Sequence, residues 1–229
     1  MGHDGPVNTA QVEALRALLG PSGWLERTRY FARALHGRAR TPRGLLIVGT
    51  PADEPWHLTA HLADESRLAG LPELEPTLVR WAPPPQAPPH LAVGLDRIER
   101  ADRSQTLLVV GSEPVPASLL ERIADARRAG SSILAIDQDD PDLDGLAHEC
   151  LAVRPALDPV SFDGAQHLVS LAVGEIALAA GQGRGLPAHA PGILPPGAQA
   201  RPAQGRPALR DRLARLLDAI SGPQQGLDR

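Results

Sequence analysis

Two turns with hydroxyl side chains follow apolar runs that are typical of buried strands. One run leads into Gly49 and Thr50, and another leads into Gly111 and Ser112, each just before a predicted helix. Hydroxyl groups and backbone N–H groups at the start of a helix can bind an anion such as a phosphate. The pattern predicts a ligand site at Gly49, Thr50, Gly111 and Ser112. The alternative is ordinary turn and helix-cap chemistry.

A second group of candidate residues shares one helical face. His57, His61 and Glu65 follow one another at intervals of four residues. Two imidazoles one turn apart can bind zinc. However, Leu58 occupies the position of the glutamate in a His-Glu-x-x-His metalloprotease. We therefore expect no metal and no cofactor. An acid and a base on this face could instead move a proton between adjacent carbons. The three residues are therefore candidate catalytic groups, and a solvated helix face is the alternative.

An acidic loop begins like a calcium-binding loop. Asp140, Asp142 and Asp144 alternate and are followed by glycine, but the twelfth position of the pattern is Leu151 where calcium loops have glutamate. We therefore expect these carboxylates to cap the short helix that follows, where they lie near its positive end.

Strands alternate with helices between residues 44 and 181, which predicts a parallel sheet with helices on both faces. The predicted class is a three-layer α/β/α sandwich with a five-stranded parallel sheet. Ligands of such folds bind at the carboxyl ends of the strands, where the two hydroxyl-bearing turns lie. The predicted strands are 44–49, 77–82, 106–111, 132–137 and 148–154, and the helices between or after them are 54–70, 90–101, 116–130 and 161–181, with a short helix before the fifth strand.

The rest of the chain predicts appendages to this domain. Helices are predicted at 9–20 and 22–36, and an amphipathic helix at 207–222 follows a stretch rich in proline and glycine. A lone helix of that length is marginal in water, so it should dock on its own domain, across a homodimer, or on a partner. The expected organisation is N-terminal helices (1–43), α/β domain (44–181), linker (182–206) and C-terminal helix (207–222).

Composition excludes several classes of function. The net charge is −4, only 3% of the residues are aromatic, and no basic stripe is present, so nucleic-acid binding is not expected. The chain contains no lysine, which excludes Schiff-base and P-loop lysine mechanisms. Cys150 is the single cysteine, which fits a reducing cytoplasm, and no apolar run is long enough for a membrane helix. We expect a cytoplasmic protein that does not enter membranes.

The stretch 107–154 resembles the sugar isomerase (SIS) domain. LLVVGSEPVPASLLERIADARRAGSSILAIDQDDPDLDGLAHECLAV parallels the SIS order of strand, serine-bearing turn, helix, strand, short helix and strand, and GLLIVGT fits the first SIS strand and turn. The resemblance extends over 44–181. The chain is also similar to an uncharacterised bacterial SIS-like family labelled phosphoheptose-isomerase-like. The resemblance implies a flavodoxin-like strand order, a phosphosugar ligand and a homodimer.

The two turns depart from the usual SIS motifs. SIS proteins that bind phosphosugars usually have Gly-x-Gly-x-Ser after the first strand and Ser-x-Ser-Gly-x-Thr after the third. Here Thr50 and Ser112 keep one hydroxyl each, and carboxylates stand at Asp53, Glu54 and Glu113. We therefore expect a non-catalytic or regulatory SIS-like protein that binds a sugar phosphate or a similar small anion. The alternatives are an aldose–ketose sugar-phosphate isomerase and a protein-interaction module that acts through its C-terminal arm.

Overall fold

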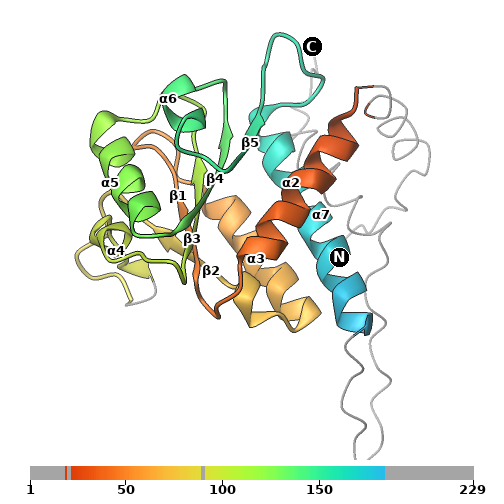
Figure 1. Ribbon diagram of the computed structural model, residues 1–229, viewed down its shortest axis with the longest axis horizontal. Coiled ribbons are helices and arrows are strands. Elements are labelled where there is room, and N and C mark those ends of the chain that lie inside the picture. Colours follow the sequence, from red (N-terminus) through yellow and green to blue (C-terminus); the bar gives the residue numbers. More distant parts are fainter. Residues whose placement is uncertain (1–18, 20–21, 89–90, 184–229) are drawn as a thin grey trace, which may run out of the picture.

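The computed structural model describes residues 19, 22–88 and 91–183 and has a five-stranded, fully parallel sheet at its centre. The strand order is β2-β1-β3-β4-β5, so β1 lies between β2 and β3 (Figure 1). In register, Val48 at the end of β1 lies opposite Val79 of β2 and Val109 of β3. The strands are β1 Leu45–Val48, β2 Pro76–Val79, β3 Thr106–Val110, β4 Ser132–Asp137 and β5 Glu149–Ala152.

The central strands are apolar because helices bury both of their faces. Every residue of β1 and β3 is buried. Successive side chains point to opposite faces of the sheet, so Ile47 belongs to one apolar cluster while Leu46 and Val48 belong to the other. This arrangement explains why the runs are continuously apolar instead of alternating.

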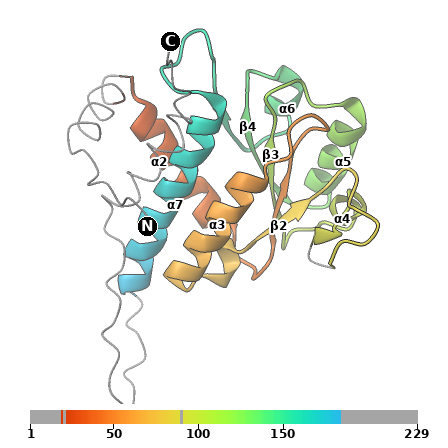
Figure 2. The ribbon, with the colours of Figure 1, turned by 180° about the vertical axis from the view of Figure 1, so that it is seen from behind.

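Helices cover both faces of the sheet, as Figures 1 and 2 show, and among the described residues three pack against each face. The predicted three-layer α/β/α sandwich is therefore confirmed. One layer consists of α2 (Trp24–Arg38), α3 (Trp56–Ala69) and α7 (Phe162–Gly183), and the other consists of α4 (Asp96–Glu99), α5 (Ala117–Arg128) and α6 (Pro141–Asp144).

The N-terminal helix α2 shares the core of the α/β domain. Trp24 is fully buried, and its indole Nε1 donates a hydrogen bond to Asp158 at 3.0 Å. Arg27 donates to the Ala152 carbonyl at 2.6 Å and lies 3.5 Å from Asp158. These contacts fasten α2 to the end of β5 and to the loop that leads into α7.

Two sequence predictions about element limits are wrong. The helix predicted over 90–101 is reduced to α4, because Gly94 pairs with Arg80 in an isolated β-bridge and the Arg80 N–H donates to the Val93 carbonyl at 2.9 Å. The strand predicted over 77–82 ends at Val79, so Trp81 lies beyond it. A 3-10 helix at Pro72–Leu74 was not predicted.

Other sequence predictions concern residues that the structure does not describe. The predicted helix 9–20 lies outside the described residues except for Leu19, which is buried. The predicted helix 207–222 and nearly all of the predicted linker 182–206 also lie outside them.

Candidate functional site

The loop after β1 is a tight turn with a fixed shape. The Asp53 N–H donates to the Thr50 carbonyl at 3.2 Å, and the Trp81 indole donates to the Gly49 carbonyl at 2.8 Å. A Cβ atom on Gly49 would lie only 2.0 Å from the Asp53 carbonyl oxygen and 2.5 Å from Pro55 Cδ. The turn therefore requires glycine at position 49, because its backbone folds back over that residue.

The loop after β3 is held by β4 and by the loop that follows β4. The Gly111 N–H donates to the Ile136 carbonyl at 3.0 Å, and the Val115 N–H donates to the Asp140 carboxylate at 2.8 Å. The other Asp140 oxygen accepts from the backbone N–H groups of Asp142 and Leu143 at the start of α6. The prediction that an acidic side chain caps this short helix is confirmed, and the same side chain also positions the β3 loop.

These two loops meet at the carboxyl edge of the sheet. A Cβ atom on Gly111 would lie 3.1 Å from the Thr50 methyl group, so the two turns touch. β2 lies beside β1 on one side of it, and β3 lies beside β1 on the opposite side, so the strand order reverses at β1. In parallel sheets, ligands bind at the carboxyl ends of the strands where the order reverses. The four predicted ligand-binding residues, Gly49, Thr50, Gly111 and Ser112, are thus brought together.

Thr50 carries a polar atom that the folded chain leaves unsatisfied. Its side chain is 2% exposed, and its Oγ1 has no hydrogen-bond partner among the described residues. Buried hydroxyl groups normally have a partner, because an unsatisfied one loses its bonds to water without replacement. A ligand hydroxyl or phosphate oxygen that reached this atom would supply the missing bond.

Ser112 has a partner that sequence reasoning did not assign. Its Oγ donates to the Asp53 carboxylate at 3.1 Å. The neighbouring Glu54 accepts two-point hydrogen bonds from Arg80, with the shortest at 2.7 Å. This bonding raises the pKa of the Arg80 guanidinium and places a cation beside Glu54. The acidic side chains were visible in the sequence, but nothing in it showed which of them Arg80 would pair with.

The candidate acid–base residues on α3 contact other helical residues. The His57 ring lies against Trp56, with ring centroids 3.3 Å apart, and the His61 ring meets His167 of α7 edge to face at 4.9 Å. Burial, followed by the charge of His61, lowers the pKa of His167. Glu65 lies two turns beyond His57, about 12 Å further along the helix axis.

A buried carboxyl group lies at the end of β4. Asp137 is 1% exposed. Its Oδ1 accepts hydrogen bonds from the Cys150 thiol at 3.4 Å and from the Asp139 N–H at 3.3 Å. Its Oδ2 has no hydrogen-bond partner among the described residues. Burial raises the pKa of Asp137 and also that of the Cys150 thiol. Cys150 is therefore an unreactive thiol at neutral pH.

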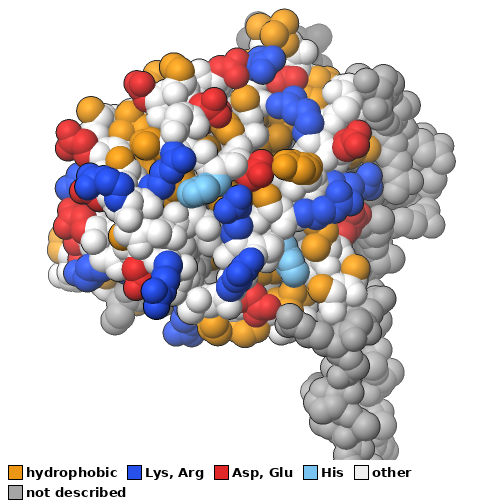
Figure 3. All heavy atoms as spheres, in the orientation of Figure 1, with side chains coloured by type: hydrophobic (Ala, Val, Ile, Leu, Met, Phe, Trp, Pro, Cys, Tyr) orange, Lys and Arg blue, Asp and Glu red, His pale blue; other side chains and the backbone are white. Residues whose placement is uncertain are grey.

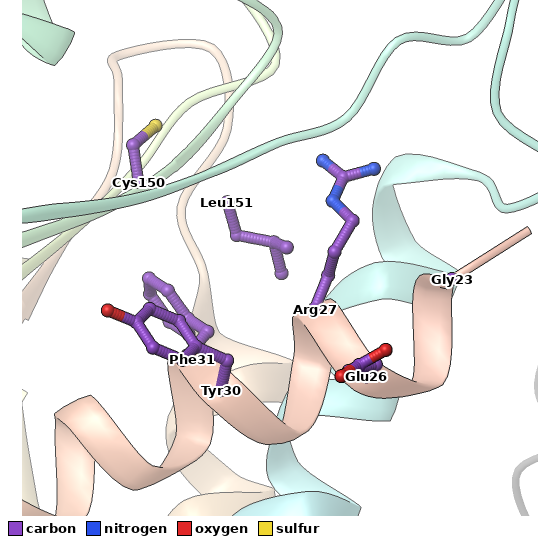
Figure 4. A pocket seen from close by; sticks show the side chains of 7 residues that line it. All are labelled: Gly23, Glu26, Arg27, Tyr30, Phe31, Cys150 and Leu151. Carbon is purple, nitrogen blue, oxygen red and sulfur yellow. The ribbon is translucent and has the colours of Figure 1, made fainter.

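Two hollows lie away from these loops. One, of about 360 Å³, lies between α2 and β5, where Arg27, Tyr30 and Leu151 line it together with Phe31 and Cys150 (Figure 4). The other, of about 400 Å³, lies between the end of α3 and the 3-10 helix and is lined by Ser66, Arg67 and their neighbours. Neither contains a residue that the sequence predicted for ligand binding.

Some classes of site find no support in the part of the chain that the structure describes. No group of three or more His, Cys, Asp or Glu side chains is placed to hold a metal ion there. None of the helices in the same residues is long and apolar enough to span a bilayer. Arginine and acidic side chains are interspersed on the face that Figure 3 shows.

The sequence matches no protein-family model and no curated protein. The structure is similar to a candidate phosphosugar isomerase from Silicibacter pomeroyi, with 15% identity and a TM-score of 0.46 over 75% of this chain and 51% of that chain. It is also similar to the sugar isomerase domain of the RpiR transcription factor from Sphaerobacter thermophilus, with 17% identity and a TM-score of 0.45 over 78% and 94% of the two chains.

A third similar structure is the Vibrio vulnificus NanR protein complexed with ManNAc-6P, with 11% identity and a TM-score of 0.43 over 76% of this chain and 66% of that chain. This chain covers about half the length of the candidate phosphosugar isomerase from Silicibacter pomeroyi and less than half of two similar structures from Salmonella typhimurium (51%, 44% and 45%).

Proposed function

We propose that this chain is a non-catalytic, SIS-like protein that binds a small sugar phosphate at the carboxyl ends of β1 and β3. The observation that carries the proposal is the buried Thr50 hydroxyl, which lacks a partner among the described residues at the point where the strand order reverses. In this proposal the hydroxyls of Thr50 and Ser112 bind ligand oxygens. The Gly111 N–H does not take part, because it already donates to Ile136.

The absence of catalysis is proposed from the position of the candidate acid–base groups. Isomerisation needs an acid and a base within hydrogen-bond reach of adjacent substrate carbons. His57 and His61 instead contact Trp56 and His167. Glu65 is buried and lies about 12 Å further along the α3 axis than His57. A phosphosugar bound at the two loops would therefore be recognised without being converted.

Thermal unfolding with a panel of sugar phosphates tests the proposal. ManNAc-6P and glucose 6-phosphate are suitable first ligands, at concentrations up to millimolar. A ligand at 100 times its Kd adds about 2.7 kcal/mol to the stability, which for a chain of this size raises Tm by roughly 5–10 °C. Thr50→Val should abolish the shift, because it removes only the hydroxyl. Thr77→Val on β2 is the matched control and should keep it. If no sugar phosphate shifts Tm, the proposal is wrong.

Two further properties are proposed, the first from the SIS resemblance and the second from the single cysteine. We infer a homodimer, and sedimentation velocity on the purified chain would test it by giving twice the monomer mass. We also infer a cytoplasmic location, which fractionation of the source cells would test. The phosphoheptose-isomerase-like label stays a prediction, since the proposed site specifies a sugar phosphate without specifying its carbon number.

A further inference from the structure

Asp53 accepts the hydrogen bond of the Ser112 hydroxyl, which a bound phosphate would also need. The Ser112 hydroxyl donates its proton to Asp53 at 3.1 Å. A hydroxyl has only one hydrogen to donate, so it cannot donate to this carboxylate and to a phosphate oxygen at the same time. An anion that uses Ser112 as a donor must take this hydrogen from Asp53. The backbone of Asp53 is fixed by its contacts with Thr50 and Gly49, so the carboxylate stays close to the site.

The charge of Asp53 is not balanced by an ion pair. Among the described residues, the neighbouring Glu54 has Arg80 as its partner, and no salt bridge involves Asp53. Other titratable groups around the loops are Glu113, which is exposed, His57 in the first turn of α3, and Asp140, which is already hydrogen-bonded behind the β3 loop. Of the cations paired at this edge among the described residues, Arg80 is engaged with Glu54 and Arg154 with Asp139.

From these contacts we infer that Asp53 is a specificity-determining residue that selects the singly charged form of a phosphorylated ligand. The inference rests on the proposed function. A phosphate monoester changes from one negative charge to two with a pKa near 6. Each additional ligand charge within about 4–5 Å of the carboxylate weakens binding by roughly fivefold in water, and by more where the site excludes water. Wild-type affinity for a phosphosugar should therefore fall as the pH rises from 5.5 to 8.

Asp53→Asn tests the inference, because an asparagine carbonyl still accepts from Ser112 while the negative charge is lost. Isothermal titration with ManNAc-6P and with glucose 6-phosphate is carried out at pH 5.5 and pH 8. We expect Asp53→Asn to bind about 25-fold more tightly than the wild type at pH 8, where the phosphate carries two charges, and about fivefold more tightly at pH 5.5. Asp64→Asn removes the same charge from the exposed surface of α3 and should change neither affinity.

A sulfated sugar separates titration of the ligand from titration of the protein. Glucose 6-sulfate carries one negative charge at both pH values, so its affinity for the wild type should not follow the decline seen with the phosphate. If its affinity falls equally, a protein group such as His57 causes the pH dependence and the inference about charge selection is wrong.

The remaining outcomes separate the two proposals. If the wild type binds a phosphosugar and Asp53→Asn binds it equally well at pH 8, Asp53 is not a specificity determinant, and the proposed function stands. If only Asp53→Asn binds, the carboxylate of Asp53 opposes the ligand, but the proposed function of the wild-type chain is wrong. If neither protein binds either phosphosugar, the proposed function is overturned and the inference falls with it.

Discussion

Replacing Thr50 by valine should stabilise the protein while it abolishes ligand binding. The substitution keeps the branched shape of the side chain and exchanges the hydroxyl for a methyl group. In the unfolded chain the hydroxyl bonds to water, whereas in the folded chain its Oγ1 is buried without a partner among the described residues. Leaving such a group unsatisfied costs about 1–3 kcal/mol. Thr50→Val should therefore raise the free energy of unfolding by about 1–2 kcal/mol.

Thr106 provides an internal control with the opposite expectation. It is also 2% exposed and lies on the neighbouring strand β3, but its Oγ1 donates to the Arg38 carbonyl at 3.0 Å. Thr106→Val removes this hydrogen bond and leaves the carbonyl without that donor, so it should lower the free energy of unfolding by about 1–2 kcal/mol. The two substitutions are chemically identical and differ in whether the hydroxyl has a partner.

Urea unfolding in the absence of ligand, followed by tryptophan fluorescence and by circular dichroism, measures both changes. In thermal unfolding each kcal/mol should move Tm by about 2–4 °C, so the two variants should move it in opposite directions. If Thr50→Val is destabilised as much as Thr106→Val, the Thr50 hydroxyl is satisfied in the folded protein. No ligand oxygen would then be needed at Thr50 to satisfy it.

Three more substitutions have definite expected effects. Gly49→Ala should lower stability by more than 3 kcal/mol in urea unfolding, because its Cβ would lie 2.0 Å from the Asp53 carbonyl oxygen. Trp24→Phe should lower stability by about 1–3 kcal/mol in the same assay, since the buried indole would lose its bond to Asp158. Asp137→Asn should raise Tm at pH 7, because burial raises the pKa of this carboxyl and its ionisation opposes folding. That gain should shrink as the pH falls toward the unfolded pKa near 4, where both chain states are protonated.

The sheet was predictable because its strands are short apolar runs separated by clear helix signals. Glycine and polar residues bound the β1 and β3 patterns on both sides, and these two observed strands fall within the predicted ranges. The segment after β2 was not predictable in the same way. Helical spacing around residue 94 suggested a longer helix, but pairing between Gly94 and Arg80 extends the chain there. This long-range contact outweighs the local pattern.

The position of the candidate site was predictable, but its internal contacts were not. Parallel topology alone brings the residues after β1 and β3 to one edge, whatever their side chains are. The bond from Ser112 to Asp53 depends instead on the turn at Gly49, which sets where the carboxylate lies. Such turns are set by a few backbone hydrogen bonds and by the Trp81 indole, which comes from another loop. No periodic pattern in the sequence encodes them.

The unsatisfied oxygens at the carboxyl end of the sheet bear on the location of the site. At the amino end, Thr106 and Ser131 donate their hydroxyl hydrogens to backbone carbonyls, whereas His36 Nε2 in the last turn of α2 has no partner among the described residues. At the carboxyl end, Thr50 and Asp137 each keep a buried oxygen without a hydrogen-bond partner among the described residues. An apolar residue at either position would avoid that cost. Unsatisfied oxygens at the edge where parallel sheets bind ligands are what a site lacking its ligand should have, and Thr50→Val measures how large the cost is.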